Sequence, residues 1–288
     1  MEMKEKEIRK AMNDSDYFKT LEPAEMLHVL VRDVVLHGDC KKKNFEIFNA
    51  ENRVKEITQE QKTDELVDVI MLAKPQQPLR DLQRMGFIRF LIDRCFYSMK
   101  MFDKRTYYAM IDNFDKLEQR DPAFRVNFFF FPFDPKISYE TFQESNFDPD
   151  TSKWMFDIID NYEEFKLLRS EVKLKRFITK WGLEFYYYMD EYADAVLNVT
   201  GLKKDFGRYT SRSYVDRWVS KGHPLFVKDL KVTDEELIAA GVPEPELTDT
   251  KKILLEHCYT HPSDNNRGML IKVAQNVGVF DKLKMKLH

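Results

Sequence analysis

Glycine and cysteine are both scarce in this chain of 288 residues, which holds nine glycines and three cysteines. Few glycines, with long stretches of sequence between glycine and proline, favour a mainly helical protein. Cys40, Cys95 and Cys258 are odd in number and far apart, which excludes a disulfide framework, and no two of them have zinc-ligand spacing. They indicate reduced thiols in an intracellular, reducing compartment, and they leave cytoplasm and mitochondrion undistinguished.

Long apolar runs and a large excess of one charge are also missing. No apolar stretch approaches the length of a membrane span, and the charged N-terminus has no run of signal-peptide length, so we expect no membrane partner. With 46 basic and 49 acidic residues the net charge is −3, which excludes a globally basic nucleic-acid binder. A local basic face remains compatible with this balance.

Residues 24–50 carry the clearest strand pattern of the chain. An apolar run around Val31, Arg32 and Asp33 is followed by an alternation that places Asn44 and Glu46 on the same side of a predicted strand. Two carboxylates at this spacing would bind a divalent metal, because Mg²⁺ prefers hard oxygen ligands on rigid supports. Here one of the two is an amide, so the pattern predicts a metal site that has lost a ligand.

The rest of the chain has helical patterns. One helix is predicted over 52–73, where Pro75 and Pro78 end it, and apolar residues recur at helical spacing from 77 to about 117. The phenylalanine-rich stretch 128–133 is predicted to be buried core rather than a base-stacking platform. Further helices are predicted over 173–180, 183–199, 209–221, 249–258 and 264–275.

A series of short motifs runs through the C-terminal half. In order they are Arg176-Phe177-Ile178, Trp181-Gly182-Leu183-Glu184, Tyr192-Ala193-Asp194-Ala195, Pro224-Leu225-Phe226-Val227-Lys228-Asp229-Leu230, Glu236-Leu237-Ile238-Ala239-Ala240-Gly241-Val242-Pro243, Ile253-Leu254-Leu255 and Asn265-Asn266-Arg267-Gly268-Met269-Leu270. Their order and spacing resemble the body and tail of the class II tRNA nucleotidyltransferases, the CCA-adding enzymes and their bacterial poly(A) polymerase relatives. The family's Pro-Gly-Pro turn is replaced here by Glu244-Pro245-Glu246.

The resemblance extends to the N-terminal region, where the family has its catalytic head. Val31, Arg32 and Asp33 match the family's Val-Arg-Asp motif. His28 and Val29 stand where the family has two glycines, which let the backbone approach a triphosphate closely. These two side chains would obstruct that approach.

Two further head motifs of the family have lost their acids. The metal-binding Asp-x-Asp strand aligns with Asn44-Phe45-Glu46. The base-reading Glu-Asp-x-x-Arg motif aligns best with Gln76-Gln77-Pro78-Leu79-Arg80, where Arg80 alone is kept; a shifted alignment would use Asp81 and Arg84. The resemblance therefore leaves Arg32, Asp33 and Arg80 as the remnant of a nucleotide-binding site.

The fold implied by the resemblance is mainly α, a helical neck, body and tail array with a small remnant α/β nucleotidyltransferase-like head at the N-terminus. We expect a truncated head over 1–75, neck and body helices over 76–168, and a body and tail helical domain over 169–288. The interval between Glu46 and Gln77 is shorter than the remaining strands of the family's head require.

Because metal ligands, phosphate glycines and base-reading acids all depart together, the resemblance implies a catalytically inactive tRNA-nucleotidyltransferase-like protein, a pseudoenzyme. It would be an RNA-binding or structural subunit of a ribonucleoprotein assembly, with a tRNA-like or ribosomal RNA and further proteins as partners, and with no cofactor. One alternative is an active, divergent CCA-adding enzyme that transfers nucleotides to RNA 3′ ends with Mg²⁺, using Glu46 with Asp33 or Asp39. Another is a purely protein-binding subunit.

A basic stretch near residue 210 is the predicted RNA-backbone contact. It contains Lys203, Lys204, Arg208 and Arg212, of which Arg208 and Arg212 would share one face of a helix. A solvated helix face is the alternative interpretation of the same residues.

Overall fold

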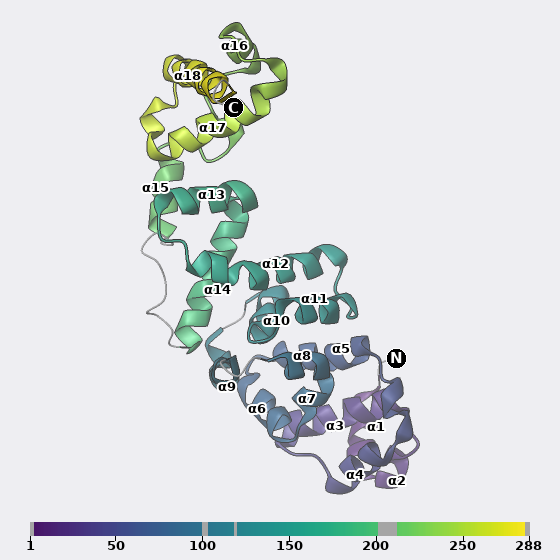
Figure 1. Cartoon of the computed structure of the whole chain (residues 1–288). Helices are drawn as coiled ribbons and strands as arrows, with labels where there is room; N and C mark the ends of the chain where they lie inside the picture. The colour runs from purple at the N-terminus through teal and green to yellow at the C-terminus, as the bar shows by residue number, and fades with distance from the viewer. Residues whose placement is uncertain (1–2, 100–102, 118–119, 201–211, 286–288) are drawn as a thin grey trace. The chain divides into compact units, whose positions relative to one another are not determined.

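The computed structural model describes residues 3–99, 103–117, 120–200 and 212–285, and every regular element in these ranges is a helix (Figure 1). The mainly α prediction is confirmed. The chain forms two compact units: unit 1 comprises Met1–Tyr162 and Asp194–Lys203, and unit 2 comprises Glu163–Ala193 and Lys204–His288. The division into 1–75, 76–168 and 169–288 stays a prediction.

Unit 1 is built mostly from short helices. The single helix expected over 52–73 is a 3₁₀ turn followed by α5, and the stretch from 77 to 117 is broken into several pieces, one of which starts after Gly86 at φ +82°. The elements are α1 (Glu5–Asn13), α2 (Ser15–Phe18), α3 (Pro23–His37), α4 (Lys42–Ala50), η1 (Asn52–Glu56), α5 (Gln59–Ile70), α6 (Gln76–Arg84), α7 (Phe87–Leu91), α8 (Asp93–Ser98), α9 (Asp103–Asp112), η2 (Phe114–Leu117), α10 (Pro122–Phe130), α11 (Pro135–Gln143) and α12 (Pro149–Lys166). The last turn of α12, from Glu163 on, belongs to unit 2.

The strand prediction for residues 24–50 is wrong, because α3 and α4 occupy this segment. Pro23 is the first residue of α3, Glu22 and Glu25 form a capping box there, and Gly38 ends the helix in the left-handed region at φ +77°. The valine-rich run between these signals is buried because α3 packs against α1, α4, α5 and α6. A helix covered on several sides is apolar on several faces, which imitates a buried strand. The remnant α/β head is therefore not found among the described residues.

The core of unit 1 is aromatic. Phe128, Phe129 and Phe130 of α10 are all buried, as the sequence predicted. The ring of Phe130 lies edge-on to that of Phe142 in α11, with ring centroids 4.9 Å apart, and Phe128 meets Phe114 at 5.8 Å. Edge-to-face aromatic pairs add to the stabilisation from area burial, so these rings join α10 to its neighbours.

Unit 2 contains the helices predicted for the C-terminal half. Helix α13 ends at Gly182, whose φ of +90° disfavours any other residue. The helices are α13 (Glu171–Trp181), α14 (Leu183–Thr200), α15 (Arg212–Ser220), α16 (Asp234–Ala239), α17 (Leu247–Thr260) and α18 (Arg267–Met285), with 3₁₀ turns η4 (Val227–Asp229), η5 (Glu244–Glu246) and η6 (Pro262–Asp264). The residues of α14 from Asp194 on belong to unit 1.

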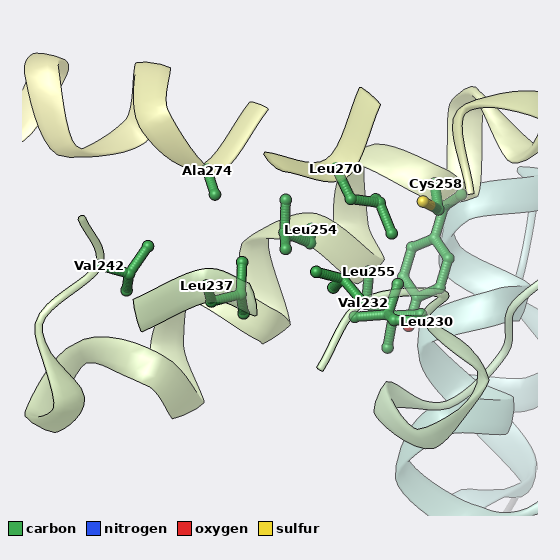
Figure 2. Packing of buried hydrophobic residues seen from close by; sticks show 10 residues of the cluster. Leu230, Val232, Leu237, Val242, Leu254, Leu255, Cys258, Leu270 and Ala274 are labelled. Atoms are coloured by element: carbon green, nitrogen blue, oxygen red, sulfur yellow. The ribbon is translucent and has the colours of Figure 1, made fainter. Parts of the chain in front are cut away.

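The last three helices share an aliphatic core (Figure 2). Leu254, Leu255 and Cys258 of α17 share this core with Leu237 of α16 and Leu270 of α18, and all five are at most 3% exposed. Their spacing on α17 places them on one face of the helix. This packing explains why the tail helices could be predicted from apolar spacing alone.

The three cysteines are buried and unpaired. Burial raises the pKa of Cys40 to about 12, with the carboxylates of Asp33 and Asp39 adding to the shift. Burial likewise raises the pKa of Cys95 and of Cys258 to about 11. These thiols are protonated packing groups at neutral pH.

Candidate nucleic-acid interface

Asn44 and Glu46, predicted to share one side of a strand, lie on different faces of helix α4. Residues two apart on an α-helix are separated by about 200° around its axis. Asn44 is fully buried, and its Nδ2 donates hydrogen bonds to the carbonyl oxygens of Ala11 (3.0 Å) and Met12 (3.4 Å). Glu46 is exposed and 3.7 Å from the Nζ of Lys42. Asn44 thus joins α4 to the end of α1.

The three residues predicted to be a nucleotide-binding remnant, Arg32, Asp33 and Arg80, have separate surroundings. Asp33 accepts the backbone N–H of Lys41 (3.1 Å) and lies 2.8 Å from Nδ1 of His37, so it fastens the end of α3 to the start of α4. Arg80 of α6 donates to Asp112 of α9 at 2.7 Å. Arg32 is half-buried on α3. Among the described residues no hydrogen bond or ion pair joins these three side chains to one another.

An acidic groove that the sequence did not predict lies in unit 1 between α3 and α5. Its volume is about 590 Å³, and Leu27 and Val67 contribute apolar surface to it. Burial and the neighbouring carboxylates of Glu60 and Asp68 raise the pKa of Asp64. The carboxylates that line the groove are Glu22, Glu25, Asp64, Glu65 and Asp68. Such a groove repels phosphate, so this part of unit 1 is unsuited to a nucleic-acid backbone.

His28, which lines this groove, makes the stability of the folded protein depend on pH. Its Nδ1 lies 2.7 Å from Glu65, and the hydrogen bond to that carboxylate raises the pKa of His28 above 6.5. A histidine whose pKa is raised by folding contributes stability that is complete below pH 6.5 and is lost as the pH rises through the folded-state pKa.

We expect the melting temperature of the Glu65→Gln variant to lose this part of its pH dependence. Thermal unfolding followed by circular dichroism across neutral pH, beside His28→Gln, measures it; unchanged pH profiles in both variants would contradict the assignment.

The predicted RNA contacts around residue 210 fall mostly outside the described residues. This applies to Lys203, Lys204 and Arg208. Arg212 starts α15, where its Nη1 lies 3.3 Å from Glu191 and its guanidinium covers the ring of Tyr187 at 4.8 Å. Arg212 is therefore already held by a carboxylate and an aromatic face, although its side chain stays about half exposed.

A basic groove lies in unit 2 on the outer face of α13. Lys173, Arg176 and Lys180 are exposed and follow at spacings of three and four, which places them along one face of the helix. The groove has a volume of about 370 Å³ and is also lined by Leu167, Leu168, Phe177 and Glu164. Leu167 is 56% exposed, whereas Leu168 and Phe177 are buried. The groove thus combines a cationic rim with an apolar floor.

Two of the three cations have carboxylate partners. Arg176 makes a two-pronged contact with Glu256 of α17, with N–O distances of 2.7 to 3.0 Å, and Glu256 raises the pKa of Arg176. Lys180 Nζ lies 4.0 Å from Glu164. Lys173 takes part in no ion pair with the residues that the structure describes. The four side chains of these two pairs are at least 41% exposed, so an anion from solution can reach both cations.

This basic groove was not predicted as a site, although its signal was in the sequence. That signal is the i, i+3, i+7 recurrence of cations over 173–180, which overlaps the motif that begins with Arg176. The apolar floor could not be predicted, because Leu167 and Leu168 lie in the turn between α12 and α13. Only the folded turn brings them beside the cations of α13.

Fold and groove together define an all-helical protein, over the described ranges, with a cation-rimmed hollow. Comparisons with protein-family models, with curated proteins and with solved structures give no match for this chain. Among the described helices none combines the length and the apolar character needed to cross a membrane.

Proposed function

We propose that this chain is a non-catalytic RNA-binding protein, a helical subunit of a ribonucleoprotein assembly, and that the basic groove of unit 2 contacts the RNA backbone. The observation that carries the proposal is the row of Lys173, Arg176 and Lys180 on one exposed face of α13. Cationic side chains that neutralise phosphates provide most of the non-specific affinity of proteins for nucleic acids.

The family resemblance supports the same interpretation. The motifs that resemble the body and tail of the class II tRNA nucleotidyltransferases lie in unit 2 or at its boundary, and the basic groove lies in the same unit. A nucleotidyl-transfer head requires carboxylates brought together to hold metal ions. In this chain Asn44 bonds to the carbonyls of Ala11 and Met12, and Glu46 faces another way on α4.

Charge reversal in the groove tests the proposal. We expect Lys173→Glu combined with Lys180→Glu to weaken binding of a tRNA, measured by filter retention at moderate salt, by at least tenfold. The unsubstituted protein should show a log–log salt slope of about −2 to −3, because up to three phosphates are neutralised. The variant should have a shallower slope.

The matched control is Lys228→Glu combined with Lys252→Glu. Both lysines are exposed, belong to unit 2 and lie outside the groove lining, and the change in net charge is the same. Equal loss of binding in both double variants would show that net charge alone matters. No retention of RNA by the unsubstituted protein would end the RNA-binding proposal.

A further inference from the structure

We propose that the hollow on α13 takes an unstacked base of single-stranded RNA while the cations of its rim hold the flanking phosphates. This inference rests on the proposed RNA binding and names the form of RNA that the groove suits. The observation behind it is that a hollow of about 370 Å³ joins three exposed cations to a partly exposed leucine.

The apolar part of the hollow is the reason to expect a base. Leu167 exposes more than half of its surface beside the buried side chains of Leu168 and Phe177. A duplex keeps its bases stacked inside and presents phosphates and sugars, which gain nothing from an apolar floor. A base in a single strand can turn outward and bury its ring on such a floor.

The arrangement of the cations suits one strand. Lys173, Arg176 and Lys180 extend along α13 over about 10 Å, at a rise of 1.5 Å per residue. They form a single row along one face of α13 and can follow the phosphates of a single backbone. Lys173, which has no ion-pair partner among the described residues, is available for the first contact.

The two carboxylates at the rim allow exchange with phosphate. The partners in Arg176–Glu256 are 59% and 41% exposed, and those in Lys180–Glu164 are 59% and 53% exposed. The Lys180–Glu164 pair, at 4.0 Å, contributes little free energy, so a phosphate can take over Lys180. Arg176 is held by two prongs, and its exposed guanidinium can add a phosphate contact beside Glu256.

The experiment compares three labelled ligands on the full chain by fluorescence anisotropy: a short single-stranded RNA, its duplex, and a strand of the same length in which every nucleotide is abasic. We expect the single strand to bind about tenfold more tightly than the other two, because burial of one base on an apolar or aromatic surface is worth at least several-fold. Leu167→Ala should weaken single-strand binding about fivefold and leave the other two affinities unchanged. Leu36→Ala, a leucine of unit 1 with 57% exposure, is the matched control and should change none of them.

Each other outcome has a separate meaning. Equal affinities for all three ligands, with no effect of Leu167→Ala, would overturn the base-binding inference and leave RNA binding standing. No binding of any of the three would overturn the proposed function and the inference together. Preferential binding of a polyglutamate peptide, tested in the same assay, would assign the groove to a protein partner and overturn the inference.

Discussion

Replacing Asn44 by aspartate is expected to destabilise the protein by about 3 kcal/mol or more at neutral pH, and not to create a magnesium site. Asn44 is fully buried on α4, and its Nδ2 donates to the carbonyl oxygens of Ala11 and Met12. An ionised carboxylate has no proton to donate, so it would face two carbonyl oxygens without a partner. Burying an unpaired charge, or protonating it to avoid this, costs several kcal/mol.

Urea unfolding followed by circular dichroism, with and without Mg²⁺, measures the effect. The matched control is Asn49→Asp, which makes the same change at an exposed position of the same helix and should alter the free energy of unfolding by less than about 0.5 kcal/mol. If Asn44→Asp were as stable as the unsubstituted protein and Mg²⁺ raised its stability, the helical environment of Asn44 described above would be wrong. The metal-site interpretation of Asn44 and Glu46 would then return.

Removing the side chain of Lys175 is the second substitution with a large expected effect. Lys175 is fully buried; its Nζ donates to the carbonyl oxygen of Tyr259 at 2.8 Å, lies 2.6 Å from Glu171 and faces the ring of Trp218 at 4.8 Å. It thereby joins α13 to the end of α17 and to α15. Lys175→Ala should lower the free energy of unfolding by about 3 kcal/mol, since it leaves a cavity and a buried carbonyl without its donor.

Two further variants separate the contribution of the Lys175 charge and hydrogen bond from that of its packing. Lys175→Met keeps most of the stem and removes the charge and the donor, so we expect a smaller loss of about 1–2 kcal/mol. The loss stays moderate because the remaining partner, Glu171, is 43% exposed and can be hydrated. Lys173→Ala, on the exposed side of the same helix, should be nearly neutral. Denaturant unfolding followed by tryptophan fluorescence gives all three values, and a neutral Lys175→Ala would contradict the buried contact set.

The helices of the C-terminal half could be predicted because their apolar residues recur at helical spacing. Leu254, Leu255 and Cys258 show this for α17. Apolar spacing gave the wrong secondary structure for residues 24–50. In α3 the valines are buried toward several helices at once, so the apolar pattern lost its helical period. Pro23 at the start and Gly38 at the end are the local sequence signals of this helix.

The sites were harder to predict than the helices, because they depend on segments that meet only in the folded chain. Asn44 and Glu46 do alternate with apolar residues in the sequence. The hydrogen bonds that Asn44 makes to α1 form only when α4 packs on that helix, so the sequence pattern does not reveal them. The acidic groove joins α3 to α5, and the basic groove joins the end of α12 to α13. Charge spacing within one helix was visible in the sequence, whereas the apolar floor beneath it was not.

Helix α14 belongs to both units, so the order of synthesis decides when all segments of unit 1 are present. Its residues up to Ala193 belong to unit 2, and those from Asp194 belong to unit 1. A ribosome makes the first 162 residues of unit 1, then the first segment of unit 2, and only then the last part of unit 1. Domains usually fold from the N-terminus as they emerge. Here the last segment of unit 1 is synthesised only after residues 163–193 of unit 2, so a chain that ends at residue 162 lacks one segment of unit 1.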